Sequence, residues 1–191
     1  GLLAFKWNEE TRYVSLLLVS MIPVGIVGFL LDDKIEGLFT GNVRMVGMML
    51  WVTALLLTFS FFAGDKSRKP SWKSAIFMGL AQALAVIPGI SRSGATISTG
   101  LILGNNREET TRFSFLMVLL PVIGANVLQL LKTDLGANTT VSPANLVLGF
   151  AAAFFFGILA CTWMIGIVKK GRLIYFAGYC FLAGLLALLL A

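Results

Sequence analysis

Histidine is absent from this 191-residue chain, and cysteine occurs only twice. The absence of histidine excludes a histidine general base and every histidine-ligated metal site within the chain. Cys161 and Cys180 lie far apart in the sequence and inside apolar stretches, so they indicate neither a disulfide framework nor a metal knuckle. We expect both cysteines to be small packing residues.

Charged residues are also scarce. They make up 13% of the chain, while 58% of the residues are hydrophobic and the mean hydropathy is +0.89. This composition excludes a soluble domain and predicts an integral membrane protein. Since about 20 helical residues cross a bilayer core, we expect an all-α, polytopic helical protein with a single transmembrane domain over residues 1–191. The predicted spans are 13–31, 44–64, 112–131, 144–168 and 173–190.

The apolar segment 72–104 differs from these spans because Pro88-Gly89 divides it. Each half is too short to cross the membrane alone. Broken backbone at membrane depth is tolerated where it is buried in protein or lines a water-filled cavity. The segment therefore predicts a re-entrant helical hairpin, which enters and leaves on one side.

The distribution of basic residues tests this topology. With a hairpin at 72–104, the loops on one side hold eleven basic residues, Arg92 not counted: Lys6, Arg12, Lys66, Arg68, Lys69, Lys73, Arg107, Arg112, Lys169, Lys170 and Arg172. The other side holds three, namely Lys34, Arg44 and Lys132. A single crossing would make the split seven to seven. The positive-inside rule therefore favours the hairpin, with the eleven in the cytoplasm and the C-terminus on the outer face.

The net charge of +6 does not indicate a nucleic-acid partner. Its basic residues flank apolar spans, where topology and anionic lipid headgroups account for them.

Within the hairpin segment, Arg92 lies among hydroxyls and glycines in the sequence Pro88-Gly-Ile-Ser-Arg-Ser-Gly-Ala-Thr96. A charge at membrane depth costs roughly 2.5 to 3.5 kcal/mol on insertion scales, so it usually has a function or a partner charge. Proline ends the first half-helix, and either Ser91 or Ser93 is a good N-cap for the second. The start of that helix has free N–H groups, the planar guanidinium of Arg92 adds several N–H donors, and hydroxyls lie nearby. These groups together predict a phosphate-type anion site.

Other readings of these residues stay open. Arg92 can instead pair with a carbonyl or carboxylate and lock the hairpin, and serine or threonine hydroxyls commonly bond back to helix carbonyls. Five further polar residues lie in or beside the spans: Gln82, Arg112, Ser114, Asn126 and Gln129. We expect most of them to form interhelical hydrogen bonds and Gln82 to face the motif.

Carboxylates are missing from the predicted membrane interior, because all nine fall in predicted loops. No metal site is therefore predicted within these residues. Phosphoryl transfer usually needs cations on the phosphate oxygens and a positioned nucleophile. Of these groups, the motif alone supplies only the cationic Arg92.

The stretch from Pro88 to Thr96 resembles the second signature of the bacterial undecaprenyl-diphosphate phosphatases, the bacitracin-resistance family. The resemblance extends along the chain through Met21-Ile22-Pro23, the lead-in from Gln82 to Pro88, Phe113-Ser114-Phe115-Leu116, Pro121 and Gly124-Ala125.

This resemblance implies an inner-membrane enzyme that converts undecaprenyl diphosphate to undecaprenyl phosphate and inorganic phosphate. It implies a role in lipid-carrier recycling for peptidoglycan synthesis and a divalent cation (Mg or Ca) as cofactor. It also implies an inverted-repeat fold with two re-entrant hairpins, and it allows a homodimer. The catalytic residues it implies are Arg92, Ser91, Ser93 and Thr96, and the substrate-binding residues are Gly89, Gly94 and Gln82.

The family's first signature, with its glutamate pair, serine and histidine, has no counterpart in these residues. We therefore expect the chain to match about the C-terminal two thirds of the family pattern, to lack the cation ligands and to be inactive alone. Two alternatives use the same motif: a polyprenyl-phosphate transporter or flippase, which would not hydrolyse its ligand, and a non-catalytic membrane scaffold.

Overall fold

The computed structural model describes residues 9–30, 43–63, 67–132 and 142–190, and these residues form seven α-helices. The helices are α1 (Glu9–Leu30), α3 (Val43–Phe62), α4 (Trp72–Leu84), α5 (Arg92–Ile102), α6 (Arg107–Lys132), α7 (Pro143–Lys169) and α8 (Leu173–Leu190). Five of them, α1, α3, α6, α7 and α8, are long and apolar enough to cross a membrane. They correspond to the five predicted spans, so the chain is an all-α, multi-pass membrane protein.

The short helices α4 and α5 occupy the segment predicted to form a hairpin, and they pack against each other. Helix α4 ends at Leu84, four residues before Pro88. We expected the helix to end at Pro88 itself. It ends earlier because proline has no N–H to donate to the carbonyl of residue 84 and its ring crowds that carbonyl; the Ile87 N–H donates to Leu84 O instead (3.1 Å).

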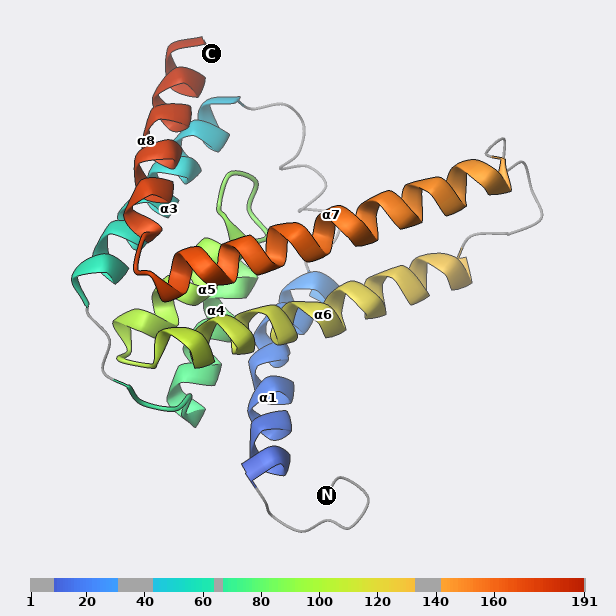
Figure 1. The fold of residues 1–191 in the computed structure, drawn as a ribbon, viewed down its shortest axis with the longest axis horizontal. Helices are drawn as coiled ribbons and strands as arrows, with labels where there is room; N and C mark the ends of the chain where they lie inside the picture. Colours follow the sequence, from blue (N-terminus) through green and yellow to red (C-terminus); the bar gives the residue numbers. More distant parts are fainter. Residues whose placement is uncertain (1–8, 31–42, 64–66, 133–141, 191) are drawn as a thin grey trace.

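The two short helices lie between the longer ones (Figure 1). Helix α4 packs with α1 and α6 around a core that contains Met78 and Phe113, both with no exposed surface. Helix α5 packs with α3, α8 and the end of α7 around a second core that contains Ile97 and Val168. Helix α7 is largely exposed, as an apolar span facing lipid would be.

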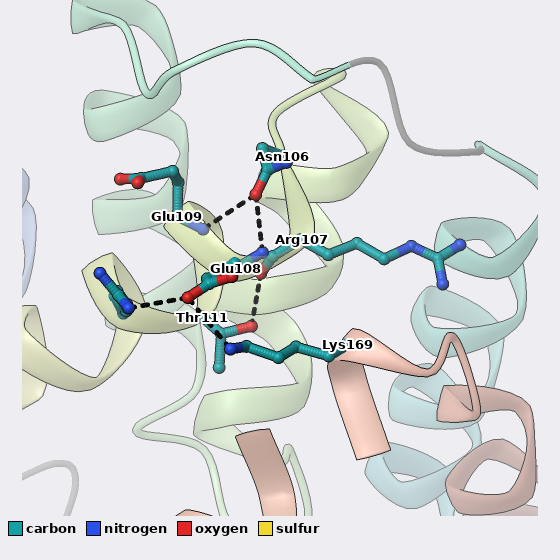
Figure 2. A network of polar contacts seen from close by, with 7 residues as sticks. Asn106, Arg107, Glu108, Glu109, Thr111 and Lys169 are labelled. Atoms are coloured by element: carbon teal, nitrogen blue, oxygen red, sulfur yellow. Dashed lines mark hydrogen bonds and ion pairs between the residues drawn. The ribbon is translucent and has the colours of Figure 1, made fainter. Parts of the chain in front are cut away.

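Polar contacts join several chain segments at the two outer ends of the α4–α5 pair. The Asn106 N–H donates to Arg68 O (2.8 Å), which ties the start of α6 to the loop before α4. Lys69 pairs with Glu9 at the start of α1 (2.6 Å). Glu108 at the start of α6 pairs with Lys169 at the end of α7 (3.0 Å), as Figure 2 shows. These contacts therefore bring together the start of α1, the two outer ends of the α4–α5 pair and the end of α7.

Some expectations fall outside the described residues. Lys6, Lys34 and Lys66, which enter the charge count, are among these. Of the two cysteines, Cys180 is buried in the core as expected, whereas Cys161 is exposed on α7. Cys161 is not a packing residue within this structure, because no other described helix covers that part of α7.

Candidate functional site

A cavity of about 470 Å³ opens beside the start of α5. Its wall is formed by the turn that joins α4 to α5 and by one face of α6. The lining residues are Ala85, Val86, Ile87, Pro88, Gly89, Ile90, Arg92, Ser93, Ser114, Phe115 and Val118. Arg92 is the one charged residue in this lining.

Ser91 is the N-cap of α5, which decides between the two caps that the sequence allowed. Its Oγ accepts a hydrogen bond from the Gly94 N–H (3.2 Å), and its backbone is extended, as an N-cap requires. Arg92 and Ser93 then occupy the first two helical positions, whose N–H groups have no intrahelical acceptor. These two amides and the positive end of the helix lie beside the cavity.

The Arg92 side chain is exposed. In the part of the chain that the structure describes, its guanidinium makes no ion pair and no hydrogen bond. The reading in which Arg92 locks the hairpin through a carbonyl or a carboxylate therefore finds no partner among these residues. A free guanidinium at a helix start is available to an external anion.

Gly89 and Gly94 shape the turn in different ways. Gly89 has φ +97°, and a Cβ there would lie 2.6 Å from Val46 O on α3. Only glycine adopts this conformation at so close an approach without strain. A Cβ at Gly94 would lie 3.0 Å from Ser91 Oγ, so a side chain there would crowd the N-cap. Gly89 lines the cavity, whereas Gly94 is buried behind it.

Thr96 and Gln82 do not line the cavity. Thr96 is fully buried, and its Oγ1 lies 2.6 Å from Ser114 Oγ on α6, while Ser114 itself reaches the cavity. Gln82 has 1% of its surface exposed, and its Oε1 has no hydrogen-bond partner. The structure thus gathers Gly89, Arg92 and Ser93 at the cavity and leaves Ser91, Gly94, Thr96 and Gln82 out of its lining.

The other polar residues in the spans behave differently from one another. Ser114 makes the expected interhelical hydrogen bond, to Thr96. Asn126 instead donates to Val122 O within α6 (2.7 Å), and Arg112 pairs with Glu108 in the same helix. Arg112 and Asn126 therefore do not add to the interhelical hydrogen bonds expected of most of these residues, because each finds a partner one turn away on its own helix. The Gln129 side chain lies outside the described residues.

Sequence reasoning missed Thr53 on α3, which is fully buried. Its Oγ1 accepts a hydrogen bond from the Ser91 N–H (3.1 Å) and lies 3.3 Å from Gly89 O. No pattern in the sequence indicates this contact, since Thr53 is an ordinary residue of an apolar span and the contact joins residues 38 positions apart.

The residues around the cavity do not fit a divalent cation. Mg²⁺ and Ca²⁺ prefer carboxylate and carbonyl oxygens, but no carboxylate lines the cavity, and Arg92 would repel a cation. Across the described ranges there is no group of three Asp, Glu or Cys residues placed to hold a metal ion. What the arrangement can do is bind an anion: it offers a guanidinium, two helix-start amides and the hydroxyls of Ser93 and Ser114.

Comparison with known proteins places these residues in a family. Residues 3–186 match the family described as "Bacitracin resistance protein BacA". The undecaprenyl-diphosphatase of Christiangramia forsetii is 49% identical over 191 residues, which are all of this chain and 72% of that protein. That of Bacteroides thetaiotaomicron is 50% identical over 188 residues, covering 97% of this chain and 71% of the relative.

An archaeal protein is similar as well. The undecaprenyl-diphosphatase of Methanobrevibacter smithii is 37% identical over 185 residues, covering 95% of this chain and 66% of that protein. The match with the family pattern and the similarity to these relatives run along nearly the whole chain and include the turn, Arg92 and the start of α5. The chain therefore belongs to the BacA bacitracin resistance family.

Proposed function

We propose that this chain carries the diphosphate-binding site of an undecaprenyl-diphosphatase, a membrane enzyme that hydrolyses undecaprenyl diphosphate to undecaprenyl phosphate and inorganic phosphate. The observation that carries the proposal is Arg92 at the start of α5, which is exposed on the wall of the cavity and has no ion-pair or hydrogen-bond partner among the described residues. The names of the relatives supply the substrate. A lipid diphosphate fits a cavity with an anion site inside an apolar protein.

We assign roles from the position of each group. Arg92 offers a planar fork of donors that can hold two phosphate oxygens at once. The amides of Arg92 and Ser93 point at the same place as the helix dipole. In the reaction, water adds to the terminal phosphorus, the bond to the bridging oxygen breaks, and undecaprenyl phosphate leaves with that electron pair. The cationic site stabilises the charge that develops on the phosphate oxygens.

The membrane placement of α4 and α5 belongs to this proposal. We place them as a re-entrant hairpin whose turn reaches membrane depth. Two observations support this: the outer ends of the pair share polar contacts with the start of α1 and the end of α7, and the basic residues divide eleven to three on this topology. A second, inverted copy of the hairpin, as the family resemblance implies, stays a prediction, because the described residues hold one such pair.

We further propose that the chain lies in the cytoplasmic membrane of a bacterium, with the basic ends inside and the C-terminus outside, as the positive-inside rule favours. Replacement of both native cysteines by alanine, followed by Ala191→Cys, gives a probe of this orientation. A membrane-impermeant maleimide should label it in intact cells. A homodimer stays a prediction that the mass of the detergent-solubilised particle would test.

We keep a divalent cation (Mg or Ca) as a proposed requirement for hydrolysis. The residues lining the cavity do not fit one, so no step above is assigned to it. Phosphate release measured with and without a chelator, and after restoring Mg²⁺ or Ca²⁺, tests the requirement.

The proposal is tested by affinity for undecaprenyl diphosphate and by phosphate release from it in detergent, with Arg92→Ala and Arg92→Lys beside the unchanged chain. We expect the alanine variant to lose about 100-fold or more in affinity, and in rate if phosphate is released, and the lysine variant to recover part of the loss, because lysine keeps the charge without the planar set of donors. Ligand binding without phosphate release would agree with the expectation that these residues are inactive alone and would leave the transporter reading open. Arg92→Ala that lowers stability and leaves ligand affinity unchanged would favour the scaffold.

A further inference from the structure

We propose that Thr53 of α3 is a positioning residue: its hydroxyl clamps the Gly89–Ser91 turn and thereby fixes where Arg92 and the start of α5 point. Thr53 does not line the cavity, so it acts through the turn. The inference rests on the proposed function, which gives the clamped site a diphosphate to bind.

The contacts of Thr53 carry the proposal. Its Oγ1 accepts the Ser91 N–H at 3.1 Å, and it lies 3.3 Å from Gly89 O and 3.2 Å from Met49 O. A hydroxyl has one proton and two acceptor lone pairs. The bond from Ser91 therefore forms whichever of the two carbonyls receives the proton. When Gly89 O receives it, one side chain holds the turn on both sides of Ile90.

The rest of the same face of α3 fits the turn closely. Val46, Met49 and Thr53 are spaced by three and four residues, which places them on one face of the helix. Gly89 lies against the first two, where a Cβ would come within 2.6 Å of Val46 O and 2.8 Å of Met49 Cβ. Gly94 lies against the third, where a Cβ would come within 3.3 Å of Thr53 Cγ2. The turn is thus docked on α3 before and after Ser91.

Burial makes the clamp difficult to replace. Thr53 has no exposed surface, so water cannot easily take over its bond to Ser91 when the hydroxyl is removed. Ser91 is the residue whose Oγ caps α5 and whose neighbour is Arg92. A shift of Ser91 would move the cap, the two helix-start amides and the guanidinium together.

The test uses four variants of the chain in detergent. Thr53→Val keeps the shape and removes the hydroxyl. Thr53→Ser and Thr53→Ala form a matched pair, since both lose the methyl group and only the serine keeps the hydroxyl. Thr58→Val is the control on the same helix, because within the described ranges the Thr58 hydroxyl bonds only to Ala54 O, one turn before it (2.8 Å). The measurements are hydrogen exchange at the Ser91 amide by NMR, affinity for inorganic diphosphate, and phosphate release.

We expect Thr53→Val to speed exchange at Ser91 by about tenfold, the net worth of one hydrogen bond. Diphosphate affinity and phosphate release should fall by about 10- to 100-fold, as a misplaced site predicts. Thr53→Ser should stay within about threefold of the unchanged chain, because it keeps the bond. Thr58→Val should change none of the three measurements.

Unchanged Ser91 exchange in Thr53→Val would overturn the clamp, as would a serine variant that loses as much as the alanine variant. If Thr53→Val does not fold, the serine and alanine pair decides by the same criteria. If the unchanged chain does not bind diphosphate, the proposed diphosphate site fails, while Ser91 exchange still decides the clamp. Absence of phosphate release is what we expect of these residues alone, and exchange and diphosphate affinity then decide the clamp.

Discussion

Gly89→Ala is the substitution whose effect on stability the structure predicts most sharply. Gly89 has φ +97°, and the added Cβ would lie 2.6 Å from Val46 O and 2.8 Å from Met49 Cβ. Left-handed backbone costs a residue with a side chain roughly 1 to 2 kcal/mol, and overpacking a well-fitted contact costs about 1 to 3 kcal/mol more. Val46 O is backbone and cannot move without moving α3. We therefore expect a loss of about 2 to 5 kcal/mol in unfolding free energy.

Gly124→Ala is the matched control for this prediction. Gly124 lies inside α6, and a Cβ there meets no atom within 4 Å. The same added methyl group should stabilise the helix by up to about 1 kcal/mol, because alanine is the better helix former. The assay is the free energy of unfolding of each variant in mixed detergent micelles, followed by tryptophan fluorescence. Equal stability of the two variants would refute the argument that the turn depends on glycine at position 89.

Two further predictions concern polar contacts elsewhere in the fold. Ser114→Ala removes the buried hydroxyl that bonds to Thr96 Oγ1. Because Thr96 Oγ1 can still donate to Arg92 O (2.9 Å), we expect a loss of about 1 kcal/mol in unfolding free energy in the same assay. A loss above about 3 kcal/mol would mean that Ser114 does more than bond to Thr96. Glu108→Gln weakens the ion pairs with Arg112 and Lys169, whose side chains are 61% and 45% exposed, so we expect only a small loss of stability, which shrinks at high salt. A loss that does not depend on salt would contradict the view of these pairs as exposed electrostatic contacts.

The spans and the motif were accessible from the sequence for simple reasons. A run of about 20 apolar residues has one stable form in a bilayer, the helix, because backbone N–H and C=O groups find no water there. Residues such as Arg92, Pro88 and Gly89 stand out in such a run because each breaks its pattern. The position of the α5 cap was predicted to within two residues, and the structure chose Ser91.

The contacts across the turn were not accessible in the same way. Thr53 and Ser91 are 38 residues apart, and nothing in the sequence of α3 says which of its faces meets the turn. Thr96 was expected beside Arg92 in the site, but its hydroxyl lies against Ser114 of α6. Which side of α5 faces the cavity depends on where α3 and α6 pack, and that is a property of the assembled helices.

Three features could be read from the residues alone: the chain crosses a membrane, segment 72–104 is broken at Pro88-Gly89, and a lone arginine lies at the start of a helix. These features follow from local rules of solvation and backbone geometry, which act within a few turns of helix. Tertiary structure decided which of the motif residues reach the cavity and which hold it from behind. That division depends on side chains of α3 and α6, and only packing brings them to α5.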